Sequence, residues 1–173
     1  MMIEAKTQIV LDADVLIHFS KGGMLSLLPS IFPDYEYVLL EIVREELNDV
    51  RTQIDQQINY LKNITLLPFE PHGDMFREYA SLRKKNLGKG ESACMAYCLF
   101  TQNVIGSSNL KDIREYCEKN KITYLTTLDF LWYAWHKELI TADEANSFIK
   151  EVRAKGSKLP DVKIEKYVCR IVL

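Results

Sequence analysis

The sequence predicts a three-layer α/β/α fold with a mainly parallel central sheet, and three observations support this. Short apolar runs alternate with longer segments of helical periodicity along the 173 residues. The runs at 7–12, 103–108 and 122–127 are apolar without strict alternation, as expected of central strands that are covered on both faces. The length suits one domain and no repeat or linker interrupts it, so residues 1–173 are expected to form a single domain.

The remaining elements follow from the same periodicity. Strands are expected at 7–12, 36–40, 64–69, 103–108 and 122–127. Helices are expected at 15–22, 39–49, 50–63, 73–85, 91–102, 110–120, 129–139 and 143–156. The last helix has the clearest boundaries, because Thr141 and Glu144 form a capping-box pattern and Gly156, followed by Pro160, marks its end.

The C-terminal residues have a looser pattern. The segment "VKIEKYVCRIVL" is rich in residues that favour strands. Residues 157–173 are therefore expected to form a strand-like extension, which either adds an edge strand or serves an oligomer contact.

Composition excludes several classes of protein. An apolar share of 47% and a charged share of 27% are those of a globular chain rather than a disordered one. No apolar run reaches the ~18 residues of a membrane span, and the pattern of a secretory signal is absent, so a cytoplasmic protein is expected. The net charge of −2 gives no global basic field. The basic stretch 83–89 is either a local nucleic-acid patch or a solvated helix end.

Cysteines and histidines give no catalytic pattern. Cys94, Cys98, Cys117 and Cys169 lack the paired spacing of a zinc site and are expected to be reduced thiols. The three histidines are scattered along the chain, so a histidine-based triad is not expected.

The first acidic residues follow a buried strand directly. In "IVLDADVLIHF", three apolar residues run into Asp12, and Asp14 stands just before a helical run. A buried carboxylate needs a partner, a metal ion or a helix end. Asp14 is expected to cap the helix, and its second oxygen could line a site.

Three further segments place acids near strand ends. One helix is expected to contain Glu41, Glu45 and Glu46, among which the pattern does not choose. Glu91 opens an apolar helix after the turn "GKG", where the helix dipole alone would favour an acid. After the strand at 103–108, Asp112 falls in the first turn of a helix for which Ser108 or Asn109 is the expected cap.

Together these acids predict a metal site. The carboxyl ends of parallel strands meet at one edge of a sheet, where binding sites form. Clustered carboxylates repel one another unless a cation lies among them. Oxygen ligands without cysteine or histidine favour a hard ion such as Mg²⁺ or Mn²⁺. Such an ion can activate water for attack on a phosphodiester.

The same residues resemble the motifs of the PIN-domain family, whose members are metal-dependent ribonucleases and include bacterial toxins. The matching segments are "VLDADVLI" with Asp12, "IVREEL" with Glu46, "GKGESACMAYC" with Glu91, and "SSNLKDI" with Asn109 and Asp112. Their order and spacing cover about the first three quarters of the chain. Many family members have an aspartate near the position of Asn109, where the nearest acid here is Asp112. This departure leaves open which residue is the fourth metal ligand and whether the site holds one metal ion or two.

The resemblance implies a PIN-like fold and a metal-dependent endoribonuclease. Its implied roles are catalysis for Asp12, Glu46, Glu91 and Asp112; Mg²⁺ or Mn²⁺ binding for Asp12, Glu91 and Asp112; and substrate binding for Asp14, Lys89, Ser108 and Asn109. The implied partners are an RNA substrate, a small antitoxin protein if the protein is a toxin, and a second copy in a homodimer.

Two other functions compete with this one. Asp12 and Asp14 also fit the first motif of haloacid-dehalogenase-like phosphatases, with Asp12 as the nucleophile. In that scheme Ser107 stands where a metal-binding aspartate belongs, and neither Glu46 nor Glu91 has a role. The third alternative is a catalytically inactive PIN-like module that binds RNA or protein.

Overall fold

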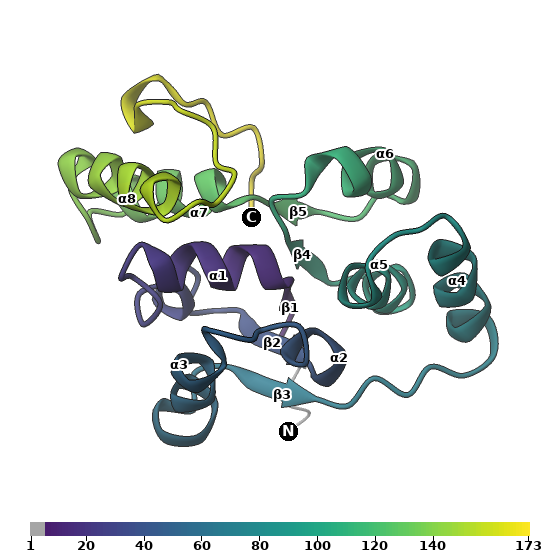
Figure 1. The fold of residues 1–173 in the computed structure, drawn as a ribbon. Coiled ribbons are helices and arrows are strands. Elements are labelled where there is room, and N and C mark those ends of the chain that lie inside the picture. Colours follow the sequence, from purple (N-terminus) through teal and green to yellow (C-terminus); the bar gives the residue numbers. More distant parts are fainter. Residues whose placement is uncertain (1–5) are drawn as a thin grey trace, which may run out of the picture.

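Five parallel strands form the centre of the molecule. The structure, a computed structural model, describes residues 6–173. The strands are β1 (Gln8–Leu11), β2 (Glu36–Leu40), β3 (Thr65–Leu67), β4 (Val104–Gly106) and β5 (Tyr124–Leu125). All neighbouring pairs are parallel and the order is β3-β2-β1-β4-β5 (Figure 1). The strand order therefore reverses at β1, and a crevice at its carboxyl end is the expected place for a site.

Between residues 6 and 173, eight α-helices and three short helical turns connect and cover these strands. The helices are α1 (Ala13–Lys21), α2 (Glu41–Arg44), α3 (Arg51–Gln56), α4 (Gly73–Lys84), α5 (Lys89–Thr101), α6 (Leu110–Asn120), α7 (Thr127–His136) and α8 (Ala142–Ala154). The turns are η1 (Leu28–Ser30), η2 (Gln57–Leu61) and η3 (Ile164–Lys166).

The helices form a layer on each side of the sheet. Figure 1 shows α1 with α7 and α8 on one side, and α4 and α5 on the other. Ile9, Val10 and Leu11 of β1 are fully buried between these layers. The three-layer fold with an all-parallel sheet confirms the predicted fold class, and each of the five expected strands is present.

The expected helix at 39–49 is much shorter than predicted, and this changes the position of its acids. Helix α2 ends at Arg44, so Glu45 is its C-cap and Glu46 lies in the following turn. The backbone N–H of Glu46 donates to the carbonyl of Val43 at 3.0 Å, a tighter spacing than that of an α-helix. The prediction of three glutamates on one helix is therefore wrong.

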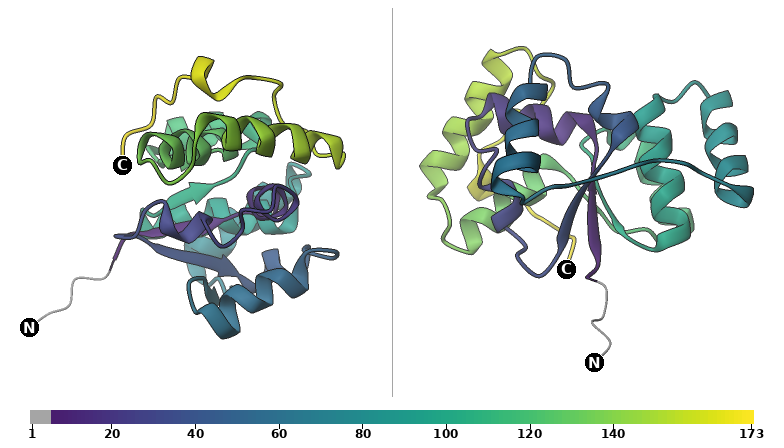
Figure 2. Two further views of the ribbon diagram at one scale, coloured as in Figure 1. Left: turned by 90° about the vertical axis from the view of Figure 1, so that its left-hand side faces the viewer. Right: turned by 90° about the horizontal axis from the view of Figure 1, so that it is seen from below.

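The C-terminal segment is not a strand. It contains one short turn, η3, in which Ile164 is buried, and it runs along α7 and α8 (Figure 2). The hydroxyl of Tyr167 donates to Asp129 Oδ1 at 2.7 Å, and the hydroxyl of Tyr133 donates to the carbonyl of Ile171 at 2.6 Å. Because these contacts are made with helix α7 rather than with a sheet edge, the expected edge strand is wrong. The oligomer contact stays a prediction.

Two smaller predictions, the boundaries of α8 and the free cysteine thiols, are confirmed. Thr141 and Glu144 form the capping box of α8, and Gly156 follows that helix with a φ of +82°. All four cysteines are free thiols, three of them buried. Over residues 6–173, none of the helices has both the length and the apolar character that crossing a membrane requires.

Candidate active site

Asp12 lies at the carboxyl end of the central strand β1. Its backbone N–H donates to the carbonyl of Gly106 at 2.8 Å and so extends the pairing of β1 with β4. Its side chain caps α1: Oδ1 accepts from the N–H of Ala13 at 2.8 Å. Oδ2 accepts from the hydroxyl of Ser107, which follows β4, at 3.1 Å. The residue is only 7% exposed, so these two bonds hold its carboxylate in a fixed place.

Asp14 has a different role from the one predicted. The N-cap of α1 is Asp12, and Asp14 lies in the first turn of the helix. The cap falls at Asp12 because the backbone there is still extended, with helical geometry from Ala13 onward. Asp14 Oδ1 accepts from the N–H of Val15 at 2.6 Å, and Oδ2 accepts from the N–H of Ser108 at 2.8 Å. Asp14 therefore ties α1 to the loop after β4.

Glu46 reaches the start of α5 from the turn after α2. Its Oε1 accepts from the backbone N–H of Gly90 at 2.8 Å. A Cβ at position 90 would lie 2.7 Å from Glu46 Oε2 and 3.1 Å from Val43, so only glycine leaves room for this approach. The turn "GKG" thus brings Glu46, the motif acid of the second segment, to the residue that precedes Glu91, the motif acid of the third.

Glu91 and Asp112 share one amide. Asn109 Nδ2 donates to Glu91 Oε1 at 2.8 Å and to Asp112 Oδ2 at 2.7 Å. Glu91 is 7% exposed at the N-terminal turn of α5, and Asp112 is half-buried in the first turn of α6. Asn109 occupies the N-cap position of α6, as one of the two sequence alternatives had it, but its side chain makes no capping bond.

The carboxylates act on one another through their charge. We call Asp12, Asp14, Glu46, Glu91 and Asp112 the carboxylate cluster. Burial and then the charge of Asp14 raise the pKa of Asp12 to about 7, and Glu46 adds to the rise. Burial and then the charges of Asp12 and Asp112 raise the pKa of Glu91 to about 7. Burial and the charge of Glu91 raise the pKa of Asp14 to about 6.

A compensating cation is missing among the described side chains. The ion pairs between residues 6 and 173 join Arg44 to Asp55, Arg77 to Asp74, Arg153 to Asp161, and Lys155 to Glu151. None of them includes a member of the carboxylate cluster. The cluster is therefore a pocket of negative charge, and a bound cation would relieve its repulsion.

A buried polar chain supports the cluster from behind. The hydroxyl of Ser108 lies 2.7 Å from that of Thr127 and accepts from the N–H of Thr127 at 2.9 Å. The Thr127 hydroxyl in turn lies 2.8 Å from His18 Nδ1. Burial, followed by the charge of Lys21, lowers the pKa of His18 to about 4, so this histidine is a neutral structural partner.

Sequence reasoning missed three residues of this region. Thr127 and His18 were not expected near the site, and Ser107 was assigned no part in a metal-dependent ribonuclease. The one available signal for Thr127 is its position two residues after β5, near the end of a strand where a site residue of a parallel sheet is expected. The spacing of Asp14 and His18, one turn apart on α1, also places them on one helix face.

Lys89 lies apart from the cluster contacts. It is the first residue of α5 and is exposed. Its side chain has neither a hydrogen bond nor an ion pair within the described part of the chain, and it is therefore accessible to a phosphate group.

The donor set fits a hard divalent cation that keeps part of its water. Every polar side-chain atom of the carboxylate cluster is an oxygen, the ligand type that Mg²⁺ and Mn²⁺ prefer. In the region from residue 6 onward, no three His, Cys, Asp or Glu side chains converge closely enough to hold one ion together. Mg²⁺ is usually bound by one or two carboxylates with water in its other positions, so a site of this ion does not need three protein ligands.

A family model described as a PIN domain matches residues 8–171, a range that includes the whole carboxylate cluster. The chain belongs to the PIN-domain family. The curated proteins include no match to it. PIN domains are generally nucleases and typically use divalent metal ions, so the family supports a fold of nuclease type. Membership confirms the resemblance found in the sequence and removes the support for a haloacid-dehalogenase-like phosphatase.

Proposed function

We propose that this PIN domain is a metal-dependent endoribonuclease that hydrolyses RNA phosphodiester bonds. The observation that supports this most directly is the carboxylate cluster. Its buried acids have raised pKa values, lie at the reversal point of a parallel sheet, and have no cationic partner among the described side chains. A protein keeps such an arrangement at a cost in stability, which is typical of functional sites.

The residues of the cluster divide into two groups in this proposal. Asp12 and Glu91 hold the divalent ion. Asp112 is linked to Glu91 by the side-chain amide of Asn109, which donates to both carboxylates. Glu46 completes the site, because its charge acts on Asp12 and its carboxylate is fixed to the N-terminus of α5. When bound, the ion lowers the pKa of a water molecule and stabilises the negative charge of the phosphodiester.

The residues proposed to meet substrate lie around this group. Asn109 and Lys89 are exposed and can approach RNA. Asp14 and Ser108 bond to each other, and Ser108 also bonds to Thr127. These inward contacts favour a supporting role for Asp14 and Ser108, in which they fix the loop after β4.

The test is cleavage of single-stranded RNA by the purified protein after EDTA treatment and return of Mn²⁺ or Mg²⁺. Wild-type protein is expected to produce internal fragments only when the metal is returned. Asp12→Asn and Glu91→Gln are expected to abolish cleavage and keep the fold, since each exchange removes charge but little volume. Glu45→Gln is the matched control, because Glu45 is exposed one residue from Glu46 and its side chain contacts no cluster member.

Three results would contradict the proposal in different ways. Cleavage of RNA by both Asp12→Asn and Glu91→Gln at the wild-type rate would show that the carboxylate cluster is not the catalytic site. Failure of Mn²⁺ to saturate the protein in calorimetric titration, together with no cleavage, would favour the inactive binding module. Phosphatase turnover that beryllofluoride inhibits would restore the alternative with Asp12 as nucleophile.

The proposal extends to a biological setting that depends on the family resemblance. In it, the nuclease is the toxin of a toxin–antitoxin pair, works as a homodimer in the cytoplasm, and is held inactive by a small antitoxin protein. Expression in cells with and without the neighbouring reading frames tests this. Growth arrest that the Asp12→Asn variant does not cause is the expected result, and growth unaffected by the active protein would contradict the toxin role.

A further inference from the structure

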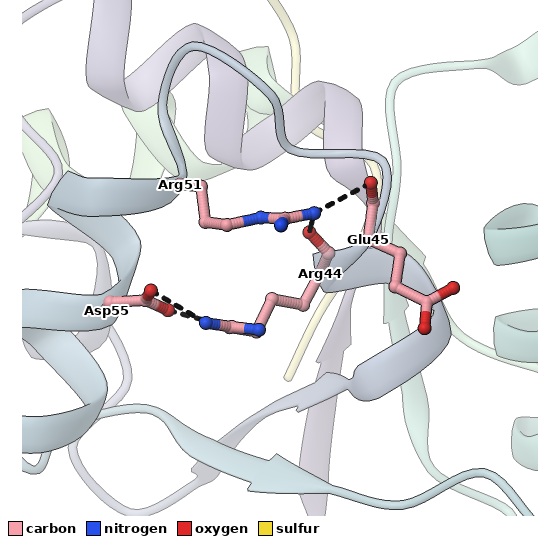
Figure 3. A network of polar contacts seen from close by, with 4 residues as sticks. All are labelled: Arg44, Glu45, Arg51 and Asp55. Atoms are coloured by element: carbon pink, nitrogen blue, oxygen red, sulfur yellow. Dashed lines mark hydrogen bonds and ion pairs between the residues drawn. The ribbon is translucent and has the colours of Figure 1, made fainter.

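Arg51, the first residue of α3, contacts the end of α2 across the loop between them. Its Nη2 donates to the backbone carbonyl of Arg44 at 3.2 Å and to that of Glu45 at 2.9 Å (Figure 3). The last carbonyls of a helix have no partner within the helix and need one from elsewhere. The carbonyl of Arg44 also accepts from the N–H of Leu47 at 3.2 Å, and the guanidinium of Arg51 adds a donor to both carbonyls at the point where the chain leaves α2.

A second contact joins the same two helices. Arg44 Nε and Nη2 donate to Asp55 Oδ1 and Oδ2, both at 2.7 Å (Figure 3). This fork-to-fork geometry is the most directional arrangement of an ion pair. Side-chain exposures of 32% and 28% shield the pair in part from water. Helix α3 therefore holds α2 by its backbone through Arg51 and by a side chain through Asp55.

The residue that follows this clamp is Glu46. Helix α2 has only four residues, too few to be stable by itself. Glu46 lies on the protein surface, and one hydrogen bond, from Gly90 to its Oε1, fixes its carboxylate. The two carbonyls that Arg51 binds belong to the two residues before Glu46, so Arg51 contacts the part of the turn from which this side chain leaves.

We infer that Arg51 is a positioning residue that holds Glu46 in the carboxylate cluster, with the Arg44–Asp55 pair as a second support. Arg51 lies behind α2 and touches no member of the cluster, so it acts through the turn at 44–46. The effect on catalysis rests on the proposed nuclease function. The effect on the geometry of Glu46 does not, and the two are tested separately.

The geometric test follows the amide of Gly90 by ¹⁵N-NMR in the metal-free protein. Loss of the carboxylate acceptor in Glu46→Gln is expected to shift this resonance, and Arg51→Gln is expected to shift it in the same direction. Arg51→Lys, which keeps a donor for the two carbonyls, is expected to restore part of the wild-type position. Arg77→Gln is the matched control, because Arg77 pairs with Asp74 on the exposed face of α4.

The kinetic test measures Mn²⁺-dependent RNA cleavage in single and double variants. Arg51→Gln is expected to lower cleavage by about 10- to 100-fold, the usual effect of removing a group that orients a site residue. If Arg51 acts through Glu46, then Arg51→Gln has little further effect in a Glu46→Gln background. If Arg51→Gln instead causes a structural defect unrelated to Glu46, it lowers the cleavage rate by the same factor in the Glu46→Gln background as in wild type.

The outcomes separate the two proposals. An unchanged Gly90 amide in Arg51→Gln, or independent effects in the double variant, overturns the positioning role. Absence of cleavage by wild-type protein overturns the nuclease proposal, and the Gly90 resonance still decides the role of Arg51. If Arg51→Gln fails to fold, then Asp55→Asn, which removes the second support, is measured in the same way, and a wild-type Gly90 amide with wild-type cleavage in that variant overturns the inference.

Discussion

The side-chain amide of Asn109 donates to Glu91 at 2.8 Å and to Asp112 at 2.7 Å, so one neutral group joins two carboxylates. The hydrogen bond favours the charged form of Glu91 and opposes the rise of its pKa that burial and the charges of Asp12 and Asp112 cause. Asn109 therefore lowers the repulsion within the cluster without adding charge. An acid at this position would have the reverse effect.

The exchange Asn109→Asp is expected to destabilise the metal-free protein and to tighten its binding of Mn²⁺. A new carboxylate between two others repels them in the metal-free protein, and a bound cation relieves this repulsion. The gain in metal affinity therefore has the same origin as the loss in stability. Thermal unfolding in EDTA and calorimetric titration with Mn²⁺ measure the two effects. Asn59→Asp on the exposed surface is the control, and weaker Mn²⁺ binding by Asn109→Asp would contradict the expectation.

The pH dependence of stability follows from the raised pKa values. Asp12, Asp14 and Glu91 bind protons more tightly in the folded than in the unfolded protein. They therefore stabilise the fold fully below their ordinary values of about 4, and this stability is lost as the pH rises to about 7. His18 acts in the opposite sense between about 4 and 6.5, because burial lowers its pKa.

Comparison of wild type with Asp12→Asn isolates one of these groups. The variant lacks the titration of Asp12, so wild type is expected to lose stability relative to it between pH 4 and pH 7 in EDTA. The slope is at most about 1.4 kcal/mol per pH unit. Urea unfolding at several pH values gives this difference, and saturating Mn²⁺ is expected to reverse it above pH 7. A difference that stays constant with pH would show that Asp12 keeps its ordinary pKa in the folded protein.

Gly90 is expected to be more important for activity than for stability. In Gly90→Ala the new methyl group meets the flexible end of Glu46, which can move aside, so the free energy of unfolding falls by no more than about 1–3 kcal/mol. The displaced carboxylate is expected to lower metal-dependent cleavage by about 10- to 100-fold. Gly88→Ala is the control, since its Cβ would lie 3.9 Å from its nearest neighbour, and equal activity of both variants would contradict the role of Gly90.

The sequence predicted where the acids gather, because that depends on local pattern and on a general property of parallel sheets. Asp12 and Asp112 could each be placed after a strand that is apolar and short, and the sheet then brings them to one edge. The choice of Glu46 depended on the family motif. Periodicity put it on a helix with Glu41 and Glu45, whereas α2 ends at Arg44, where a side chain from α3 donates to the backbone carbonyls of Arg44 and Glu45.

The supporting residues could not be predicted for a related reason. His18 and Thr127 are 109 positions apart, and their contact arises only when α1 and α7 pack together. Asp14 was misplaced by a smaller margin, since the point at which a strand gives way to a helix is uncertain by a residue or two in any sequence pattern. Contacts between distant segments, rather than element types, therefore account for what the sequence left undetermined.

The hydroxyl of Thr127 offers a test of whether the polar chain behind the cluster supports it. Thr127→Val keeps the shape of the side chain but leaves His18 Nδ1 without its partner and weakens the hold on Ser108, at a cost of about 1–3 kcal/mol in the free energy of unfolding. Because the N–H of Ser108 fixes Asp14, cleavage is expected to fall as well, even where the protein is fully folded.

Urea unfolding and cleavage below the unfolding transition measure the two losses. Thr52→Val on the surface of α3 is the control and should stay within about 0.5 kcal/mol of wild type. Loss of stability with full activity would show that the polar chain of Ser108, Thr127 and His18 has only a structural role. The loop after β4 would then keep Asp14 in place without the Thr127 hydroxyl.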